Sequence, residues 1–579
     1  MLMIFVGFAE VLSLGAVFPF LSVLLSPEKA MHSGFFGQAL TDWTERLGLS
    51  PSLMLTIMFS VAILAASAFR LTFLHISTRL AAAIGSDLSI EVYRRVLHQP
   101  YSVHVVRNSS EVIGAIVGKV NTTTNVIYQC LVLVCSAFMT LSLVSALIVI
   151  DSKVAIIASF CFGAGYAVVG RVSRKMLRKN SHQIADLHTA QLKNLQEGLG
   201  GIRDVLLDSA QNVYCEAFRL TDRDMRQALA GNTIITGSPR YFMEAVGTVL
   251  IVVLAYQMST QDGGFLDALP VLGGLAVAAQ RLLPALQQSF AAWAIIAGSH
   301  ASVIDTISML ELPMPSTEVA GRGEQLALRN SITIDALSFR YSPNVPWALD
   351  NVSLEIPRGA RVGFIGETGS GKSTLLDLVM GLLLPTAGRI RVDGVAVEEG
   401  AIKAWQKTIA HVPQSIFLAD SSIAENIAFG VAIKEIDMDR VRQAARRAQI
   451  ADFIEGRQNG YAEIVGERGV RLSGGQRQRI GIARALYKQS TVLVFDEATS
   501  ALDSETEYSV MESINTLDRS LTILMIAHRV STLKDCDSII ELKNGHIVAQ
   551  GSYADLSGNS NSFTKKPIPS TGFSPVNSI

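Results

Sequence analysis

Six stretches of this chain are apolar and long enough to cross a membrane as helices. They occupy residues 1–25, 53–74, 126–150, 154–170, 241–258 and 265–296. About 20 mostly apolar residues span a bilayer as a helix. The sixth stretch is the weakest, because Asp267, Gln280, Arg281 and Gln287 interrupt it. The pattern predicts six transmembrane helices with both chain ends on one side. The first stretch starts at the first residue, so we expect the sequence to be short at its start.

The loops between the stretches differ sharply in charge. The loops after the second and fourth stretches are basic, with Arg79, Arg94, Arg95, Arg107 and Lys119 in one and Arg171, Arg174, Lys175, Arg178, Lys179, Lys193, Arg203, Arg219, Arg223 and Arg226 in the other. The opposite side has only Lys29, Arg46 and Lys153. Cytoplasmic loops carry the excess of Lys and Arg, so we place both basic loops in the cytoplasm.

The two basic loops also have helical apolar spacing, over 86–97 and 184–199. We therefore expect spans two to five to continue into the cytoplasm as helices. Bends are expected near 99–110, where Pro100 and Asn108-Ser109-Ser110 interrupt or cap a helix, and near 206–215. On the other side, 30–49 contains Trp43 among apolar residues. This segment is either an amphipathic helix at the membrane interface or an ordinary loop.

Five ionisable residues fall within or at the edge of the predicted spans. An ionisable group at membrane depth is costly and usually faces a cavity. Snorkelling to the headgroups or an internal ion pair is the alternative, and Arg240 and Glu244 are one helical turn apart. For Arg240, at the cytoplasmic edge, this alternative is favoured, whereas for Arg70 and Arg281 both interpretations stay open. The five residues are Glu10, Arg70, Arg240, Glu244 and Arg281.

Composition agrees with a membrane protein of more than one domain. The chain has 579 residues, of which 49% are hydrophobic and only 17% charged, and a soluble chain normally carries about 25% charged residues. A net charge of −1 gives no indication of nucleic-acid binding. The five cysteines have no metal-ligand spacing. We interpret them as reduced packing residues.

The second half has a different pattern. We assign 1–310 to the transmembrane domain and 311–330, with two prolines and two glycines, to a linker. Residues 331–557 alternate short β-branched strands with helices, which predicts an α/β nucleotide-binding domain. The tail, 558–579, is rich in Ser, Pro, Asn and Gly and is expected to be disordered.

A phosphate-binding loop follows the predicted strand 361–365. The stretch fits G-x-x-x-x-G-K-[ST] and precedes an apolar helix. Backbone N–H groups of such a loop and the helix N-terminus suit phosphates, the lysine reaches the β- and γ-phosphates, and the serine hydroxyl ligates Mg²⁺. A chance glycine-rich turn is the alternative. The loop residues are Gly366, Glu367, Thr368, Gly369, Ser370, Gly371, Lys372 and Ser373, followed by Thr374.

The apolar run 491–495 ends in two carboxylates. A phosphate-loop enzyme needs a carboxylate near Mg²⁺, and Asp496 at the strand end fits this role. Glu497 is one residue further and could act as the general base on the attacking water. A strand ending in Asp-Glu is a weak signal of function when it occurs alone. At this separation from a complete phosphate loop, the same signal is strong.

The most discriminating stretch is Leu472-Ser473-Gly474-Gly475-Gln476, at the start of a predicted helix. A helix N-terminus with a serine hydroxyl suits a γ-phosphate. Here the chain resembles the ATP-binding cassette (ABC) family, of which this pentapeptide is the signature. The resemblance covers nearly the whole chain. It implies that Ser473, Gly475 and Gln476 of one subunit close over the phosphate loop of another.

The other family motifs occur in order. Tyr341 matches the aromatic residue that stacks on adenine, and Gln414 matches the glutamine that touches Mg²⁺ and the attacking water. His528 matches the histidine that contacts the γ-phosphate. Residues 466–469 resemble the short loop before the signature in exporters, and 500–503 match the segment crossing the dimer interface. Alone, a single His or Gln is more often structural.

The resemblance implies an exporter half-transporter: an all-α domain of six transmembrane helices, then an α/β phosphate-loop NTPase domain with the ABC helical subdomain. One chain cannot build a composite ATP site, so a homodimer is expected and a heterodimer stays possible. The implied cofactors are ATP and Mg²⁺. Because Glu497 and His528 are both present, both sites should hydrolyse ATP. We expect an integral protein of a bacterial inner membrane, with its cassette in the cytoplasm and no nucleic-acid partner.

For the substrate, the membrane half resembles the bacterial lipid-linked oligosaccharide flippases. The similarity rests on Val17-Phe18-Pro19-Phe20, on 239–244, and on Arg70, Arg240 and Arg281, which in those flippases line the cavity and engage a lipid pyrophosphate. A lipid A-type exporter and a multidrug exporter are the alternatives. A non-transport cassette ATPase and an ATP-regulated channel are hypotheses from other classes; the six spans argue against the first.

Overall fold

The computed structural model describes residues 2–15, 50–150, 152–259, 264–314, 326–398, 400–497, 507–508, 511–512, 514, 519–527 and 530–558. The predicted interfacial segment and all but the first residue of the predicted tail therefore lie outside the described residues. The chain forms two compact units. The first, the helical unit, comprises 1–99 and 106–314, and the second comprises 100–105 and 315–579.

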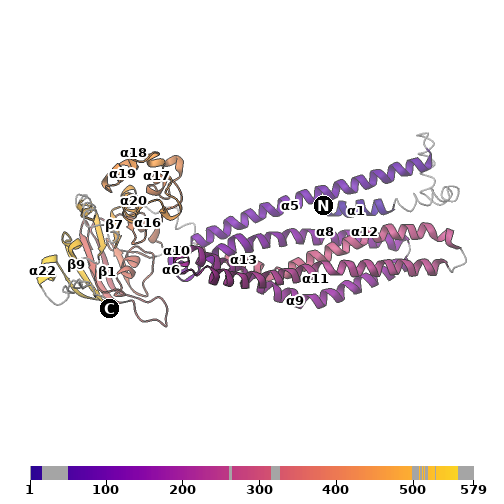
Figure 1. Cartoon of the computed structure of the whole chain (residues 1–579), viewed down its shortest axis with the longest axis horizontal. Coiled ribbons are helices and arrows are strands. Elements are labelled where there is room, and N and C mark those ends of the chain that lie inside the picture. The colour runs from indigo at the N-terminus through magenta and orange to yellow at the C-terminus, as the bar shows by residue number, and fades with distance from the viewer. Residues whose placement is uncertain are drawn as a thin grey trace, which may run out of the picture. The chain divides into compact units, whose positions relative to one another are not determined.

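The helical unit consists of long helices that run side by side (Figure 1). They are α1 (Leu2–Gly15), α5 (Pro51–Leu97), α8 (Val120–Ile150), α9 (Ser152–Gly200), α11 (Gln211–Ser259) and α12 (Gly264–Gly298). Each predicted span lies on one of these helices as far as the described residues reach. With 47, 49 and 49 residues, α5, α9 and α11 are roughly 70 Å long, about twice the hydrocarbon thickness of a bilayer. The predicted helical continuation past the membrane thickness is therefore confirmed for spans two, four and five, whereas α8, which carries span three, has 31 residues.

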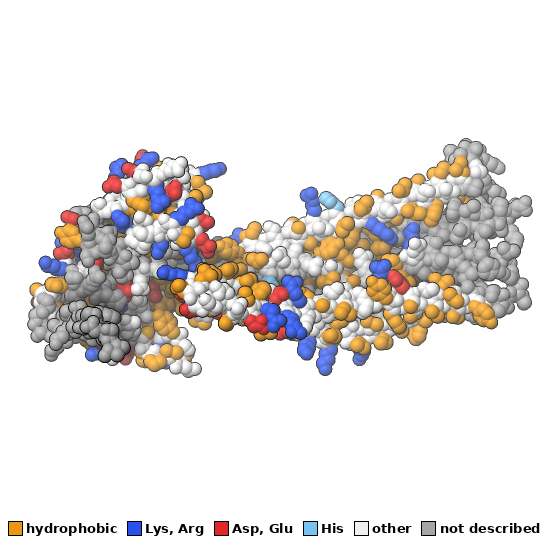
Figure 2. All heavy atoms as spheres, in the orientation of Figure 1, with side chains coloured by type: hydrophobic (Ala, Val, Ile, Leu, Met, Phe, Trp, Pro, Cys, Tyr) orange, Lys and Arg blue, Asp and Glu red, His pale blue; other side chains and the backbone are white. Residues whose placement is uncertain are grey.

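Within the described ranges, three helices are long and apolar enough to cross a membrane, or four if one bent pair counts as a span. Helices over 53–97, 109–149 and 155–200 qualify singly, and 280–298 with 300–310 qualifies as a pair bent by 55°. Large apolar side chains are exposed along the unit, and Figure 2 shows hydrophobic side chains spread over its visible face. Exposed apolar area of this extent requires lipid or another protein against it. Examples are Leu64, Leu71, Phe160, Val172 and Tyr256.

Short helices lie at the two predicted bends. After α5 come α6 (Tyr101–Val106), α7 (Ser109–Gly114), which Asn108 caps by accepting a hydrogen bond from the Ser110 N–H, and the π-helix η1 (Ala115–Lys119). After α9 comes α10 (Ile202–Leu207). The turn at 208–210 between α10 and α11 lies within the predicted 206–215, but α9 already ends at Gly200, where two consecutive glycines follow each other. Residues 100–105, within and just before α6, group with the second unit.

The core of the helical unit lies where α8, α9, α11 and α12 meet. Leu143, Phe162, Met243 and Leu282 are buried together there. α13 (His300–Leu310) is fastened to the η1–α8 segment by two side-chain pairs. Lys119 Nζ lies 2.6 Å from Asp305 Oδ2, and the hydroxyls of Thr123 and Thr306 are 2.9 Å apart.

The second unit contains two sheets. One is antiparallel, in the order β2-β1-β4-β5, and the other has the order β10-β9-β3-β8-β7-β6. The strands are β1 (Ser331–Phe339), β2 (Leu349–Pro357), β3 (Arg361–Ile365), β4 (Ala387–Val392), β5 (Val395–Ala396), β6 (Ile409–Val412), β7 (Val492–Asp496), β8 (Thr522–Ile526), β9 (Ser538–Lys543) and β10 (His546–Gly551). β3 pairs in parallel with β8 and β9, and β7 pairs in parallel with β6 and β8.

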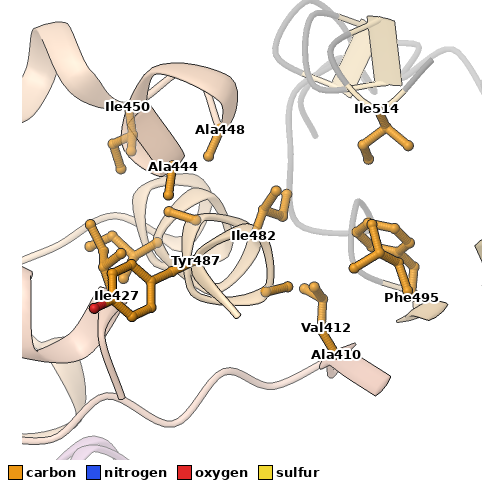
Figure 3. Packing of buried hydrophobic residues seen from close by; sticks show 14 of the residues in the cluster. Ala410, Val412, Ile427, Ala444, Ala448, Ile450, Ile482, Tyr487, Phe495 and Ile514 are labelled. Carbon is orange, nitrogen blue, oxygen red and sulfur yellow. The ribbon is translucent and has the colours of Figure 1, made fainter. Parts of the chain in front are cut away.

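The helices of this unit cover the sheets and form the predicted helical subdomain. They are α15 (Lys372–Val379), α16 (Ile402–Gln406), α17 (Ile423–Ile427), α18 (Met438–Arg447), α19 (Ala451–Glu455), α20 (Gly474–Tyr487), α22 (Tyr553–Gly558) and short 3₁₀ turns. In Figure 3, Ile482 of α20 packs in one cluster with Ala444 of α18 and Val412 of β6. α20 therefore links the helical subdomain to the sheet.

Candidate functional site

The phosphate loop connects β3 to α15, as predicted. Gly366 and Gly371 have φ angles of +146° and +101°, which side chains rarely adopt. A Cβ on Gly366 would lie 2.1 Å from the carbonyl oxygen of Leu542, and one on Gly371 would lie 2.6 Å from that of Ala348. The glycines therefore let the loop fold tightly against β9 and β2, with the N-terminus of α15 opening directly onto it.

Lys372 is buried at the start of α15, only 6% exposed. Its Nζ donates hydrogen bonds to the carbonyl oxygens of Gly366 at 2.8 Å and Glu367 at 2.9 Å. Burial lowers the pKa of the Lys372 ammonium, while the charges of Glu497 and Asp496 oppose this effect. The lysine is thus placed inside the loop, with two carboxylates near enough to influence its ionisation.

The carboxyl ends of the parallel strands β3, β7 and β6 bring the remaining polar groups to the same edge. Gln414 follows β6, and its Nε2 donates a hydrogen bond of 2.6 Å to Glu497 Oε2. Glu497 follows β7 with a φ of +50°, and its N–H bonds the carbonyl oxygen of Ile526 at the end of β8. This unusual backbone angle fixes the direction in which the Glu497 side chain leaves the strand.

Tyr341 lies just after β1. Its hydroxyl is 3.0 Å from Thr374 Oγ1 of α15, and its ring packs edge-on against Phe339 at 5.0 Å between centroids. The residue is 52% exposed. One side of the ring is therefore accessible to a flat apolar group such as a purine, while the hydroxyl ties it to the helix that follows the phosphate loop.

The signature residues form the N-terminus of α20. Ser473 Oγ accepts a hydrogen bond from the Gln476 N–H at 3.2 Å, and Gln476 Oε1 accepts one from the Ser473 N–H at 2.9 Å. This capping box fixes the first turn. It leaves Gly474 and Gly475 partly accessible, without side chains to block the helix terminus.

The donor set fits a nucleoside triphosphate with a divalent cation. The loop N–H groups, Lys372 and the α15 N-terminus suit phosphate oxygens. Because Gln414 uses Nε2 toward Glu497, its Oε1 is left to ligate a cation, together with the Ser373 hydroxyl and the Asp496 carboxylate. Such a site needs few protein ligands. In the described ranges, no group of three or more His, Cys, Asp or Glu side chains could hold a metal.

Two predicted elements of the nucleotide site cannot be placed. His528 and the segment 500–503 lie outside the described residues. In the helical unit, Arg70 and Arg281 line one cavity of about 530 Å³ between α1, α5, α8 and α12. Arg240 does not line it. Its Nε donates a 2.9 Å hydrogen bond to Glu244 Oε1, the ion pair that the sequence spacing favoured.

Sequence reasoning missed two charged residues that support the site. Arg484 on α20 donates from Nε to the carbonyl oxygen of Asn426 at 2.9 Å and stacks on Phe429 at 4.5 Å, which holds α20 against α17. Asp377 on α15 is the second. Burial, with a smaller contribution from the charge of Asp496, raises the pKa of Asp377 to about 6. No motif marks either residue, because both act through contacts made only in the folded chain.

Asp377 should make stability depend on pH. Its folded pKa of about 6 exceeds the ordinary aspartate pKa of 3.8, so the folded state binds more protons between these values. The stability that protonated Asp377 contributes to the folded state is therefore fully present below about pH 4. It is lost as the pH rises through about 6. Asp377→Asn should therefore raise the free energy of unfolding at neutral pH by about 1–3 kcal/mol and have little effect at acidic pH.

With the other three tryptophans replaced by phenylalanine, denaturant unfolding followed by Trp405 fluorescence measures this effect locally. Trp405 Nε1 donates a 2.7 Å hydrogen bond to the α15 carbonyl oxygen of Val379. Asp452→Asn, at an exposed position on α19, is the control. A difference between wild type and Asp377→Asn that does not change with pH would contradict the assignment.

Comparisons with known proteins agree with this geometry. Residues 4–261 match the ABC transporter transmembrane region and residues 349–500 match the ABC transporter family. The chain is 31% identical over 486 residues to the ATP-dependent lipid A-core flippase of Paraburkholderia xenovorans (strain LB400), covering 81% of this chain and 78% of the relative.

The flippase of the same name from Cupriavidus metallidurans is 31% identical over 498 residues, covering 84% of this chain and 81% of the relative. The solved structure of a bacterial Atm1-family ABC exporter with ATP bound superposes with a TM-score of 0.78 at 24% identity, covering 96% of this chain and 94% of that one. This last similarity supports the fold alone. The chain belongs to the ABC transporter family and is an integral membrane half-transporter of the exporter type, whose ATPase cassette drives transport.

Proposed function

We propose that this half-transporter is a flippase that moves a lipid with a phosphorylated saccharide head group across the inner membrane. The observation that carries the proposal is the cavity of about 530 Å³ in the helical unit, to which Arg70 of α5 and Arg281 of α12 both contribute. Two guanidinium groups at one cavity give its lining a basic character. Guanidinium pairs well with phosphate oxygens.

The other cavity residues suit an amphipathic ligand. Tyr128, Gln280 and Gln288 offer hydrogen-bonding groups for sugar hydroxyls, whereas Phe73, Val132 and Met139 supply apolar contacts. A volume of this size holds part of a head group rather than a whole glycolipid. We infer that the acyl chains stay in lipid while the cavity encloses the phosphorylated end. A multidrug exporter would not need two arginines at this place.

The relatives narrow the class of lipid. Two that are 31% identical are lipid A-core flippases, and lipid A-type and lipid-linked oligosaccharide substrates share phosphate next to sugar. The lipid A-type lipid is therefore the first candidate. The lipid-linked oligosaccharide stays a more specific prediction, supported by the residue patterns around Arg70, Arg240 and Arg281.

The cassette residues give the energy-coupling step. We propose that two copies of the chain close on two ATP molecules, each held by Lys372 and the loop N–H groups of one copy and by Ser473 and Gly475 of the other. A heterodimer with a related chain would work in the same way. Ser373, Gln414 and Asp496 would hold Mg²⁺, which supplies charge neutralisation at the phosphates. Tyr341 would stack on adenine.

In this scheme Glu497 takes the proton of the attacking water, and His528 would contact the γ-phosphate. The short helices α6 and α10 would pass cassette closure to the membrane helices, which alternate between inward- and outward-facing states. The cassette would face the cytoplasm, as the basic loops of the membrane half indicate.

Translocation in proteoliposomes tests the proposal. With fluorescent lipid A-type lipid or fluorescent lipid-linked oligosaccharide, the wild type should translocate at least one of them when ATP is supplied. Arg70→Gln and Arg281→Gln should each lower translocation by about tenfold or more, because each removes a charge-assisted hydrogen bond worth roughly 1.5–3 kcal/mol. Arg79→Gln is the matched control, since Arg79 is exposed on the same helix as Arg70 and does not line the cavity.

The two lipids separate the candidate substrates. Translocation of only one assigns the lipid class. Efflux of cationic dyes without translocation of either lipid would favour the multidrug alternative. ATP hydrolysis that drives neither process would contradict transport of these classes, while equal loss in Arg79→Gln would remove the cavity from the explanation.

A further inference from the structure

A second lined space lies between α9 and α12, apart from the cavity of Arg70 and Arg281. It consists of a cavity of about 670 Å³ and a cavity of about 310 Å³. Arg174 and Trp293 line both, so the two form one groove, and none of the residues lining it also lines the other cavity. We call it the basic–aromatic groove and define it by Arg171, Arg174, Arg178, Tyr166, Phe290 and Trp293.

The basic side of the groove is a row of arginines on α9. Arg171, Arg174 and Arg178 are spaced three and four residues apart, which places them on one helix face. Within the described part of the chain, no carboxylate forms an ion pair with any of the three. By contrast, on α11 Arg219 and Arg226 are paired with Glu216 and Asp222 at 2.6 and 2.7 Å. The groove therefore gathers positive charge that the described residues do not neutralise.

The other side of the groove is aromatic. Tyr166 lies 5.5 Å from Phe290, and Phe290 lies 5.6 Å from Trp293, between ring centroids. A Cβ at Gly170 would lie 3.7 Å from the Trp293 ring, so α9 passes the ring at van der Waals distance. Tyr166 Oη is buried and has no hydrogen-bond partner among the described residues. An unsatisfied buried hydroxyl beside a cavity indicates a missing polar partner.

The groove lies at the depth of lipid head groups. The predicted span 154–170 ends just before Arg171, and the predicted span 265–296 contains Phe290 and Trp293 near its end. Aromatic residues concentrate at this depth, and the basic loop that begins at Arg171 marks the cytoplasmic side. A ligand here would meet charge at its head and apolar surface along its tail.

We propose that the basic–aromatic groove binds an anionic glycerophospholipid of the cytoplasmic leaflet. Its head-group phosphate would lie among Arg171, Arg174 and Arg178, and the first part of its acyl chain would lie along Phe290 and Trp293. Charge complementarity favours this occupant, because a protein surface would need carboxylates and a zwitterionic lipid carries its own cation. The inference requires only that the chain is a membrane protein and does not depend on which lipid is transported.

Fluorescence quenching of Trp293 in nanodiscs tests the proposal. The chain has four tryptophans; Trp347 and Trp405 belong to the cassette, and Trp43 is replaced by phenylalanine. The Trp293 signal is the part that is lost in Trp293→Phe. Phosphatidylglycerol brominated on its acyl chains should quench this signal with an apparent affinity about tenfold or more above that of brominated phosphatidylcholine.

The arginines should account for the preference. Arg171→Gln, Arg174→Gln and Arg178→Gln should each lower the relative affinity for phosphatidylglycerol by about fivefold. Lys175→Gln and Lys179→Gln are matched controls, because these lysines lie at the same depth on α9 but line neither cavity of the groove. They should leave the preference unchanged, since quenching reports only lipid that touches Trp293.

A filling variant gives a second readout. Gly170→Leu should place its side chain against Trp293 and abolish the preferential quenching. Gly163→Leu is its control, because a Cβ at Gly163 meets nothing within 4 Å. Equal quenching by the two lipids, or equal loss in the lysine variants, would overturn the proposal. If neither lipid quenches Trp293 and the arginine variants weaken the dimer, the groove binds a second copy of the chain. That result would also overturn the lipid proposal.

Discussion

Glu497→Gln should lower ATP hydrolysis by about two to four orders of magnitude, because a general base contributes that much to a proton transfer. Glutamine has the size of glutamate but cannot accept the proton of the attacking water. The 2.6 Å contact with Gln414 shows that Glu497 lies at the edge where Gln414 could ligate a cation. ATP affinity should stay within about threefold of the wild type, since the loss concerns only the transition state.

Steady-state phosphate release and equilibrium binding of labelled ATP measure the two quantities separately. Glu355→Gln is the control, because it makes the same chemical change at an exposed position of β2. Turnover near the wild-type rate in Glu497→Gln would remove Glu497 from the role of base. A parallel loss of ATP affinity would instead point to a role in binding.

The membrane fold was predictable because lipid imposes a simple rule on sequence. A spanning helix needs a long apolar run, and the runs at 53–74 and 154–170 lie on α5 and α9 as predicted. The lengths of these helices were also predictable, since their apolar spacing continues past the lipid boundary. The second bend was predicted in part, because the turn at 208–210 lies within 206–215, whereas the end of α9 at Gly200 was not predicted.

The cassette was predictable for another reason. The phosphate loop, Gln414, Asp496 and the signature are short motifs in which glycines or strand ends fix the geometry locally. The parallel pairing of β3, β8, β7 and β6 then brings their ends to one edge. The bond from Gln414 to Glu497 and the positive φ of Glu497 could not be predicted. They depend on residues separated by more than 80 positions and on the carbonyl oxygen of Ile526.

Sequence separated the membrane arginines only in part: the one-turn spacing to Glu244 set Arg240 apart, but nothing local showed that Arg70 and Arg281 line one cavity. Arg70, Arg240 and Arg281 have the same chemistry, but two share a cavity and one pairs with Glu244. The arginines of α9 appeared only as an excess of positive charge in a loop. Their shared face opposite Trp293 depends on how α9 packs against α12, which no local pattern encodes.

Gly366→Ala should abolish tight ATP binding, with an increase in Kd of about 100-fold or more. That increase corresponds to about 2.7 kcal/mol, the worth of one or two charge-assisted hydrogen bonds. A methyl group at Gly366 would lie 2.1 Å from the carbonyl oxygen of Leu542 and 2.7 Å from Ser370 Oγ, with φ at +146°. Leu542 belongs to β9, which pairs with β3 through Ile365 and Glu541. The sheet cannot yield easily, so the loop must move.

Gly369→Ala separates this clash from backbone strain. Gly369 lies in the same loop with φ at +83°, but a Cβ there meets nothing within 4 Å. Its substitution should cost only the strain of a left-handed alanine, about 1–2 kcal/mol. Isothermal titration with ATP should therefore show strong loss in Gly366→Ala and modest loss in Gly369→Ala, while both proteins remain folded by circular dichroism. Equal affinities in the two variants would mean that close packing against β9 does not hold the loop in its binding conformation.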